Sequence, residues 1–239
     1  MKTKIQRAGD RGHAQHGWLN TYHSFSFGHW YDPTKINFGA LRVLNDDEIG
    51  AGEGFGAHPH DNMEIVTIPL KGSVAHKDST GTDGIIKTGD VQIMSAGTGI
   101  RHSEFNASKT ESLSLLQLWV IPKKRNIEPR YDQKTFKSED RENKWQIVVS
   151  PDDKGALWIN QDSIFALSHL SKGSFLTYTN KFSGSGVYLF IIGGAVDISN
   201  EILESRDAIE ITNADSFDIK ANEDSEILVI EVPMLQLQN

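Results

Sequence analysis

The chain of 239 residues contains no cysteine. This absence excludes disulfide bonds, thiolate metal sites and cysteine nucleophiles together. Any transition-metal site must therefore use histidine and carboxylate ligands, which suit iron, manganese, cobalt, nickel or copper without choosing among them.

Long hydrophobic runs and positive charge are lacking as well. No apolar run reaches the roughly 18 residues that a membrane-spanning helix needs. The N-terminal segment MKTKIQRAGDRGHAQH is charged and lacks the apolar stretch of a secretory signal. The formal net charge of −8 argues against direct nucleic-acid binding, because phosphate contacts need a basic surface. We therefore expect a cytoplasmic protein that binds neither membranes nor nucleic acid directly.

What is present indicates a globular, strand-rich protein. Hydrophobic residues make up 38% of the chain and charged residues 23%, which is typical of a chain with a buried core. Short apolar runs bounded by turn residues predict two series of strands. Residues 38–44 are predicted to form a strand, residues 45–56 a polar loop, and residues 122–145, rich in charge, a linker between the two series.

Two short histidine motifs in the first series carry the functional signal. His58 and His60 form an H-x-H pair, and His102 and Glu104 form an H-x-E pair. Residues two apart on a β-strand point to the same face, so each pair would present its two side chains together. Two such strands that meet inside a barrel would converge on one ion, which makes these four residues candidate metal ligands.

Two types of metal site fit these residues, a closed structural site and an open site with free coordination positions. Four closed ligands describe a structural ion, for which zinc would serve. An open site is the expected arrangement, because the mouth of a β-barrel is a usual ligand site and a glycine-rich loop, residues 97–99, lies beside His102. Four ligands on a six-coordinate ion leave positions free, so His76 is expected to have a partner or surface role instead of being a fifth ligand.

Glycine spacing around the histidines resembles a known family. The patterns G-x5-H-x-H-x3-E-x7-G and G-x5-S-A-G-T-G-x2-H-x3-N resemble the two motifs of the cupins, which are jelly-roll barrels. Two sequence segments, HPHDNMEIVTIPLKGSVAHKDS and QIMSAGTGIRHSEFN, are similar to those of the pirin family. Ser95 stands where many cupins have proline, and the gap between Glu64 and Gly72 is one residue longer than usual.

The resemblance implies an all-β protein with two tandem cupin barrels. Residues 1–134 would be the metal-binding domain, and residues 135–239 a degenerate cupin domain without metal ligands. A faint internal repeat agrees, since LKGSVAH around Gly72 resembles IGGAVDI around Gly194. The implied ligands in pirins are His58, His60, His102 and Glu104, with Glu64 outside the set. The implied cofactor is one divalent transition metal ion, with iron expected first and manganese, cobalt, nickel, copper or zinc as alternatives.

The activity implied by the resemblance is quercetin 2,3-dioxygenase. In the mechanism we expect, Glu104 takes the proton of the flavonol 3-hydroxyl, dioxygen adds to the enolate, and carbon monoxide leaves. The substrates would be a flavonol-like aromatic molecule and dioxygen. Phe25, Phe27 and Trp119 are candidates for stacking on the flavonol, and the alternation in HSFSF predicts that His23, Phe25 and Phe27 share one face of a strand.

Two other functions stay open from the sequence. Animal pirins are described as iron-responsive transcriptional co-regulators, so a non-enzymatic metal-binding protein that acts through a protein partner is the alternative. A cupin enzyme acting on another small phenol or keto acid is a third reading. We expect a monomer, because the chain already pairs two barrels.

Overall fold

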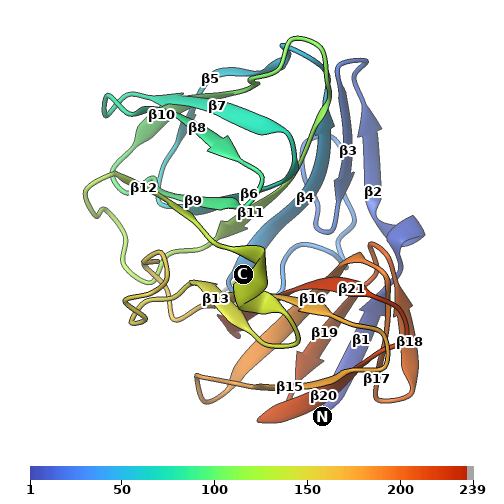
Figure 1. Cartoon of the computed structure of the whole chain (residues 1–239). Helices are drawn as coiled ribbons and strands as arrows, with labels where there is room; N and C mark the ends of the chain where they lie inside the picture. Colours follow the sequence, from blue (N-terminus) through green and yellow to red (C-terminus); the bar gives the residue numbers. More distant parts are fainter. Residues whose placement is uncertain (236–239) are drawn as a thin grey trace.

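The computed structural model describes residues 1–235 and contains no α-helix in that range. The strands form two barrels that lie side by side, coloured blue to green and orange to red in Figure 1. Every strand pair is antiparallel. This arrangement confirms the predicted all-β class with two barrels. No helix in residues 1–235 combines the length and apolarity needed to cross a bilayer.

The first barrel consists of a seven-stranded and a four-stranded sheet. The seven-stranded sheet contains, in spatial order, β12 (Arg130–Thr135), β9 (Asp90–Ser95), β6 (Glu64–Lys71), β11 (Leu113–Val120), β4 (Leu41–Ile49), β3 (Leu19–His23) and β2 (Gly12–Gln15). The four-stranded sheet contains β5 (Gly54–His60), β10 (Ile100–Asn106), β7 (Ser73–Asp78) and β8 (Asp83–Lys87).

The second barrel has a six-stranded and a four-stranded sheet. The first of these contains β1 (Lys2–Gln6), β19 (Ala208–Thr212), β16 (Ser185–Gly193), β21 (Ser225–Pro233), β14 (Ile164–Leu170) and β13 (Gln146–Val149). The other contains β15 (Phe175–Thr179), β20 (Ser216–Ala221), β17 (Ala195–Ile198) and β18 (Glu201–Glu204). Two 3₁₀ turns, η1 (Ala8–Asp10) and η2 (Ser138–Arg141), complete the fold.

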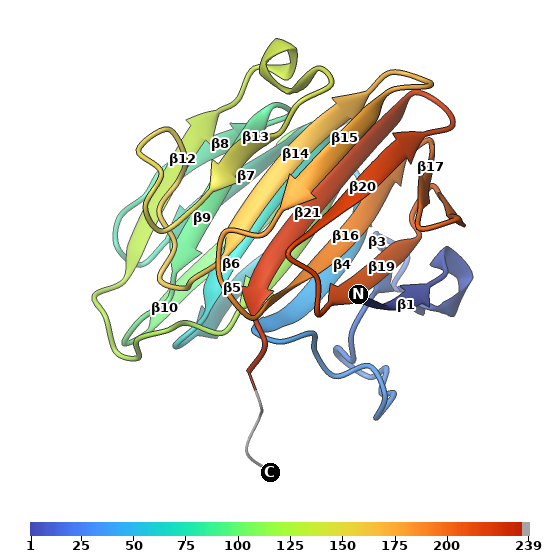
Figure 2. The same cartoon turned by 90° about the horizontal axis from the view of Figure 1, so that it is seen from below.

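Strand β1 belongs to the second barrel although it begins the chain. It pairs with β19, and Figure 2 shows it beside the red strands. The chain thus crosses between the barrels twice, once after β1 and once after β12. The domain division between residues 134 and 135 stays a prediction, and residues 236–239 of the predicted second domain lie outside the described residues.

The internal repeat has a clear structural counterpart. Gly72 separates β6 from β7, and Gly194 separates β16 from β17, each with φ of 84°. A side chain at Gly194 would meet the carbonyl oxygen of Asp224 at 2.3 Å, so this turn requires glycine both for its conformation and for space. The two resembling segments therefore occupy matching turns of the two barrels.

Two predictions of loop or linker segments were wrong, and in both cases the segment contains a polar strand. Residues 45–49 belong to β4 instead of a loop, and residues 130–135, within the predicted linker, form β12 at the edge of the seven-stranded sheet. Neither segment carries the apolar alternation from which strands are predicted. In β4 the reason is specific, because its inward side chains Asn45 and Asp47 face a polar barrel interior.

A row of polar side chains crosses the interior face of the seven-stranded sheet. The strand registers place His23 opposite Asn45, Asn45 opposite Gln117, Gln117 opposite Thr67, and Thr67 opposite Gln92. All five residues are buried. Their chain neighbours point the other way and pack between the barrels, among them Leu44, Val66, Ile93, Leu116 and Leu118. The first barrel therefore contains a buried polar layer. Burying polar groups costs free energy unless they are hydrogen-bonded.

The second barrel has a different interior. Its core is one large apolar cluster that includes Ile164, Val187, Leu189, Ile209 and Val229. The buried carboxylate of Glu231 accepts bonds from the hydroxyls of Tyr178 and Ser185 and from the backbone N–H groups of Lys181 and Phe182, at 2.6–2.9 Å. These donors satisfy the carboxylate, so Glu231 has a structural explanation.

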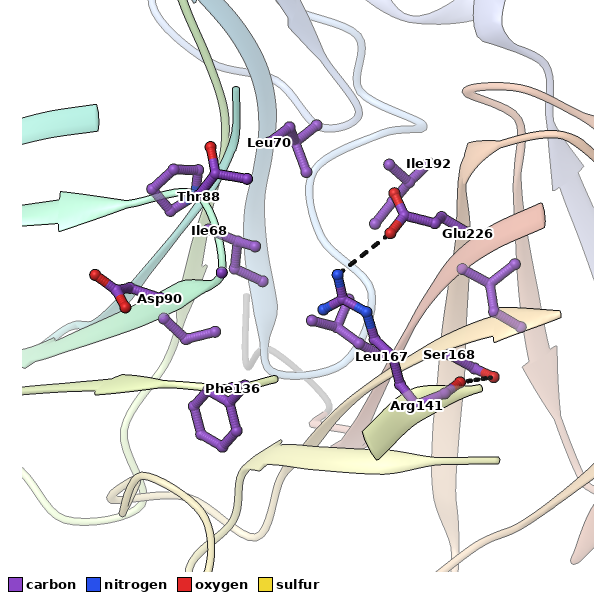
Figure 3. Close-up of a pocket in the computed structure, with 14 residues that line it drawn as sticks. Ile68, Leu70, Thr88, Asp90, Phe136, Arg141, Leu167, Ser168, Ile192 and Glu226 are labelled. Carbon is purple, nitrogen blue, oxygen red and sulfur yellow. Dashed lines mark hydrogen bonds and ion pairs between the residues drawn. The ribbon is translucent and has the colours of Figure 1, made fainter. Parts of the chain in front are cut away.

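The barrels pack through a shared apolar core, and a small cavity lies within the contact. Phe25 of the first half contacts Tyr188 of the second with ring centroids 5.4 Å apart. Figure 3 shows the cavity, with the ion pair of Arg141 and Glu226 (3.3 Å) on one side and Asp90 on the other. Its volume of about 70 Å³ is far below the roughly 300–1,000 Å³ of small-molecule sites. This small cavity is therefore not a substrate site.

Candidate metal centre

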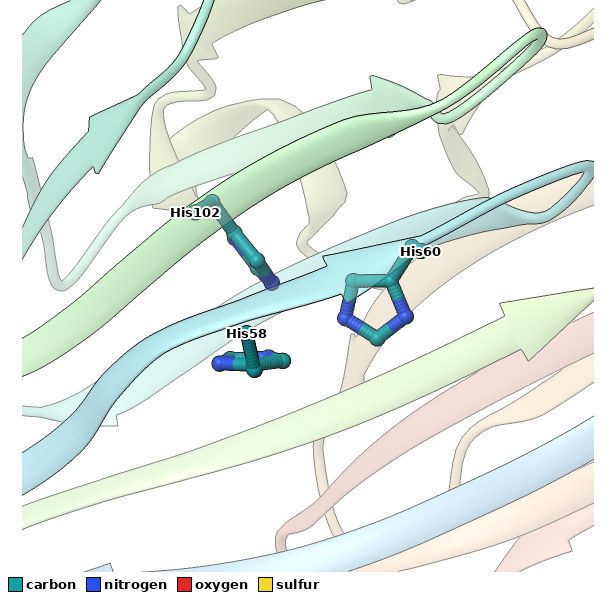
Figure 4. A group of neighbouring side chains, drawn as sticks. All are labelled: His58, His60 and His102. Atoms are coloured by element: carbon teal, nitrogen blue, oxygen red, sulfur yellow. The ribbon is translucent and has the colours of Figure 1, made fainter.

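Three histidines converge inside the first barrel. His102 on β10 lies directly opposite His58 on β5, and His60 lies two residues further along β5. The ring centroids are 4.5 Å (His58–His102), 4.8 Å (His58–His60) and 4.9 Å (His60–His102) apart. Figure 4 shows the three rings pointing toward one another. One ligand atom from each lies within 4.8 Å of the others, close to the roughly 4.2 Å that two metal–nitrogen bonds can span.

The free nitrogens of these rings fit a metal ligand set. His58 Nδ1 lies 2.8 Å from the carbonyl oxygen of Gly56, so it carries the proton and leaves the Nε2 lone pair free. His60 Nε2 and both ring nitrogens of His102 are buried without a hydrogen-bond partner in the described part of the chain. Buried polar atoms rarely lack partners. A bound cation would satisfy one lone pair on each ring, while the other nitrogen of His102 carries the proton.

Burial also keeps the imidazoles of His60 and His102 neutral. Desolvation, helped by the neighbouring imidazoles, lowers the pKa of His102 to about 3 and that of His60 to about 4. A neutral imidazole offers its lone pair to a metal at physiological pH, whereas a protonated ring would not. The electrostatics of the cluster thus favour metal binding.

An irregularity in strand β10 separates Glu104 from His58 on the neighbouring strand. The register between β5 and β10 shifts between His102 and Glu104, so that Glu104 lies opposite Phe55. A bulge of this kind re-aims side chains and is frequent beside active sites. Gly54 permits it, because a Cβ there would meet the Glu104 carbonyl oxygen at 2.2 Å. Glu104 belongs to a second group, with His76 and His102, whose ligand atoms lie within 4.8 Å of one another.

Two residues of the polar row hold the Glu104 carboxylate. The Thr67 hydroxyl donates to Oε1 at 3.2 Å, and Gln117 Nε2 donates to Oε2 at 3.0 Å. The indole N–H of Trp119 in turn donates to Gln117 Oε1 at 3.2 Å, which fixes the orientation of the amide. The Trp119 ring packs edge-on against His60 with centroids 4.8 Å apart. One hydrogen-bonded chain therefore links the carboxylate to the wall of the histidine cluster.

His76 is buried and has a hydrogen-bond partner, which is the first of the two roles expected for it. Its Nε2 lies 3.0 Å from Asp78 Oδ2, and its ring packs against Tyr131 at 4.7 Å and His102 at 5.3 Å. Sequence reasoning gave no role to Thr67, Asp78 or Tyr131. The H-x-D spacing of His76 and Asp78 was a usable signal for the dyad, since residues two apart share a face.

Glu64, in the position of the cupin-motif glutamate, lies apart from both groups. Its Oε2 accepts bonds from the Ser95 hydroxyl at 2.8 Å and from the backbone N–H of Asn160 at 3.2 Å. Burial raises its pKa. Because Asn160 lies beyond β13, Glu64 ties the first barrel to a later segment of the chain.

A cavity of about 590 Å³ lies beside the histidine cluster. Its lining residue Phe55 packs against His58 at 6.4 Å, and its lining residue Phe27 packs against Trp119 at 5.4 Å. Phe25, by contrast, lies in the core between the barrels, so its expected place on one face with His23 and Phe27 was wrong. The strand β3 ends at His23, and the alternation that the prediction assumed ends with it.

The buried Asp47 on this cavity wall provides a test by pH. Burial raises its pKa to about 7, with small additions from Asp46 and Glu104, although the Thr21 hydroxyl donates to it and opposes the shift. The folded state then keeps a proton that the unfolded state releases near pH 4, so stability falls as pH rises from about 4 to 7, by roughly 1.4 kcal/mol per pH unit.

We expect Asp47→Asn to lack this pH dependence. The stability of the variant relative to the unchanged protein should therefore rise between pH 4 and 7 and stay level outside that window. Urea unfolding of both metal-free proteins across the pH range measures it. Parallel stability curves would show that Asp47 titrates normally.

Comparisons with known proteins agree with this geometry. The family described as Pirin matches residues 4–120, and the quercetinase C-terminal cupin domain matches residues 147–232. The chain is 43% identical over 230 residues to the quercetin 2,3-dioxygenase of Escherichia coli K12, covering 96% of this chain and 98% of that protein. It is 40% identical to a pirin-like protein of Caulobacter vibrioides, covering 92% and 95% of the two chains.

Solved structures show the same similarity. The crystal structure of the bacterial pirin YhhW from Escherichia coli in complex with nickel(II) has a TM-score of 0.93 and 41% identity, covering 98% of this chain and 100% of that one. Bacillus subtilis oxalate decarboxylase, at 12% identity and a TM-score of 0.65, shares the fold alone. Sequence, architecture and the histidine-lined barrel together show that the chain belongs to the pirin family of two-barrel cupin proteins.

Proposed function

We propose that this chain is a metal-dependent quercetin 2,3-dioxygenase that cleaves flavonols with dioxygen. One observation carries the proposal: three imidazoles, two of them with buried ring nitrogens that lack a partner within residues 1–235, converge beside an aromatic-lined cavity of about 590 Å³. Its volume lies within the range of small-molecule sites. The near full-length similarity to the Escherichia coli quercetin 2,3-dioxygenase supports the same activity here.

His58, His60, His102 and Glu104 are the proposed ligands of one divalent transition metal ion. When bound, such an ion would act as a Lewis acid toward a substrate oxygen and supply redox chemistry with dioxygen. Three neutral imidazoles and one carboxylate leave a divalent ion with a net positive charge, which suits an anionic flavonolate. Iron is our first expectation, and the nickel complex of the Escherichia coli pirin supports a site that accepts several ions.

Glu104 is the proposed general base. Among residues 1–235, its carboxylate accepts hydrogen bonds only from the neutral groups of Thr67 and Gln117, so it retains the capacity to take a proton from the flavonol 3-hydroxyl. Gln117, fixed by the Trp119 indole, holds the carboxylate in place. Dioxygen then adds to C2 and C4 of the deprotonated flavonol. The O–O, C2–C3 and C3–C4 bonds break, C3 leaves with its oxygen as carbon monoxide, and both atoms of dioxygen stay in the ester product, so one carbon monoxide is released for each dioxygen consumed.

The aromatic walls of the cavity would bind the substrate rings and exclude water. Phe27 lines the cavity and contacts Trp119 edge to face, with centroids 5.4 Å apart. Trp119 is not among the lining residues, but it packs against His60 and so connects this wall to the histidine cluster. Aromatic rings recognise flat aromatic ligands by offset or edge-on packing. These two residues keep the stacking role expected from the sequence as part of the proposal.

Oxygen uptake by the metal-loaded protein with quercetin tests the function. We expect many turnovers per chain, with equal amounts of dioxygen consumed and carbon monoxide released. Metal binding without any turnover would favour a protein that responds to metal and acts through a partner. A cytoplasmic location and a monomeric state stay predictions.

A further inference from the structure

The cavity beside the histidines has a polar patch on one wall. Thr21 and His23 on β3 lie opposite Asp47 and Asn45 on β4, and all four line the cavity. The Thr21 hydroxyl lies between the other groups, because it donates to Asp47 and lies 3.5 Å from His23 Nδ1. Buried polar groups grouped on one wall of an aromatic cavity are the usual means of orienting a ligand.

The hydrogen bond to Asn45 fixes the protonation of His23. Nδ1 lies 2.8 Å from the Asn45 side-chain oxygen, which can only accept, so Nδ1 carries the proton. Burial lowers the pKa of His23 and keeps the ring neutral. Nε2 is therefore a hydrogen-bond acceptor, and no partner for it is found within residues 1–235. Because His23 lines the cavity, a ligand bound there can donate a hydrogen bond to Nε2.

The remaining walls define the kind of ligand. Trp18, Phe27, Trp30 and Phe55 line the same cavity, and Phe27 packs against the His23 ring with centroids 5.3 Å apart. Such walls fit a flat aromatic ring. The acceptor nitrogen of His23 and the adjacent carboxyl group of Asp47 would lie at the edge of such a ligand ring. Both can bind hydroxyl groups, so the ligand that fits is a phenol.

We propose that His23 and Asp47 form a recognition site for two adjacent phenolic hydroxyls, and so select flavonols that carry a dihydroxyphenyl ring. This inference rests on the proposed function and assigns the end of the substrate remote from the metal. His23 Nε2 accepts one hydroxyl proton in a hydrogen bond, and Asp47 binds the neighbouring hydroxyl. Specificity follows because an analogue without hydroxyls leaves both buried groups unpaired.

The test compares binding of quercetin with binding of galangin, a flavonol without hydroxyls on that ring. Metal-loaded protein is titrated under nitrogen so that no turnover occurs, and tryptophan fluorescence reports binding, since Trp18 and Trp30 line the cavity. We expect quercetin to bind at least about tenfold more tightly than galangin. His23→Leu should remove most of this difference and leave galangin binding within threefold, with His23→Gln partly restoring it.

His169→Leu, in the second barrel, is the matched control and should behave like the unchanged protein. Equal affinity for the two flavonols in the unchanged protein overturns the inference even if the variants do not fold, and so does a difference that survives in folded His23→Leu. Selective binding without oxygen uptake would defeat the proposed function alone. Oxygen uptake together with equal affinity for both flavonols would defeat this inference alone, and no binding of either flavonol would defeat both.

Discussion

His102→Ala is expected to lose the metal and with it the flavonol dioxygenase activity. His102 belongs to both groups of potential ligands, with His58 and His60 on one side and His76 and Glu104 on the other. Loss of a residue that only hydrogen-bonds to a metal ligand lowers metal affinity by roughly 10–100-fold. Loss of the ligand His102 itself should therefore lower metal affinity by at least about 100-fold. Elemental analysis of the purified variant, together with oxygen uptake with quercetin, measures both effects.

His169→Ala is the control for this prediction, because it removes a histidine from the second barrel and should keep full metal content. Thermal unfolding must show that both variants are folded. A folded His102→Ala variant with one tightly bound ion per chain would place the metal elsewhere.

Glu104→Gln is expected to separate metal binding from catalysis. The amide keeps an oxygen that can ligate the ion, but it cannot accept the substrate proton. General-base contributions are typically about 10²–10⁴-fold, so we expect turnover to fall by that much while metal content falls far less. Steady-state oxygen uptake per bound metal ion is the quantity to compare.

Glu64→Gln provides a matched buried carboxylate in the same barrel. Glu64 bonds to Ser95 and to the Asn160 backbone, away from the histidines, so this variant should keep both metal and turnover. Loss of metal in Glu64→Gln but not in Glu104→Gln would reverse the roles that we propose for the two glutamates.

The histidine cluster was accessible from the sequence because it uses the simplest rule of β-structure. Residues two apart share a face, so His58 with His60, and His102 with Glu104, are readable as pairs. That His102 lies directly opposite His58 depends on strand register, which the spacing does not give. The bulge that separates Glu104 from His58 is likewise a property of how β5 and β10 pair.

The groups that support the cluster were not accessible in the same way. Thr67, which donates to Glu104, lies in a strand whose other face packs between the barrels, and a lone polar residue in an apolar strand gives no signal of its partner. The same polar interior hid β4 beyond Leu44, because strand prediction relies on apolar side chains facing inward. Pairing of β1 with β19 joins residues some 200 positions apart and leaves no local trace.

Metal reloading with a continuous activity readout tests the central claim most directly. The protein is stripped of metal and then given increasing amounts of iron(II) without oxygen, and each sample is assayed for oxygen uptake with quercetin and for bound metal. We expect turnover to rise in proportion to bound metal and to level off at one ion per chain. Activity that survives in the stripped protein, or a fully loaded protein without any oxygen uptake, would contradict a dioxygenase whose chemistry depends on this histidine-lined site.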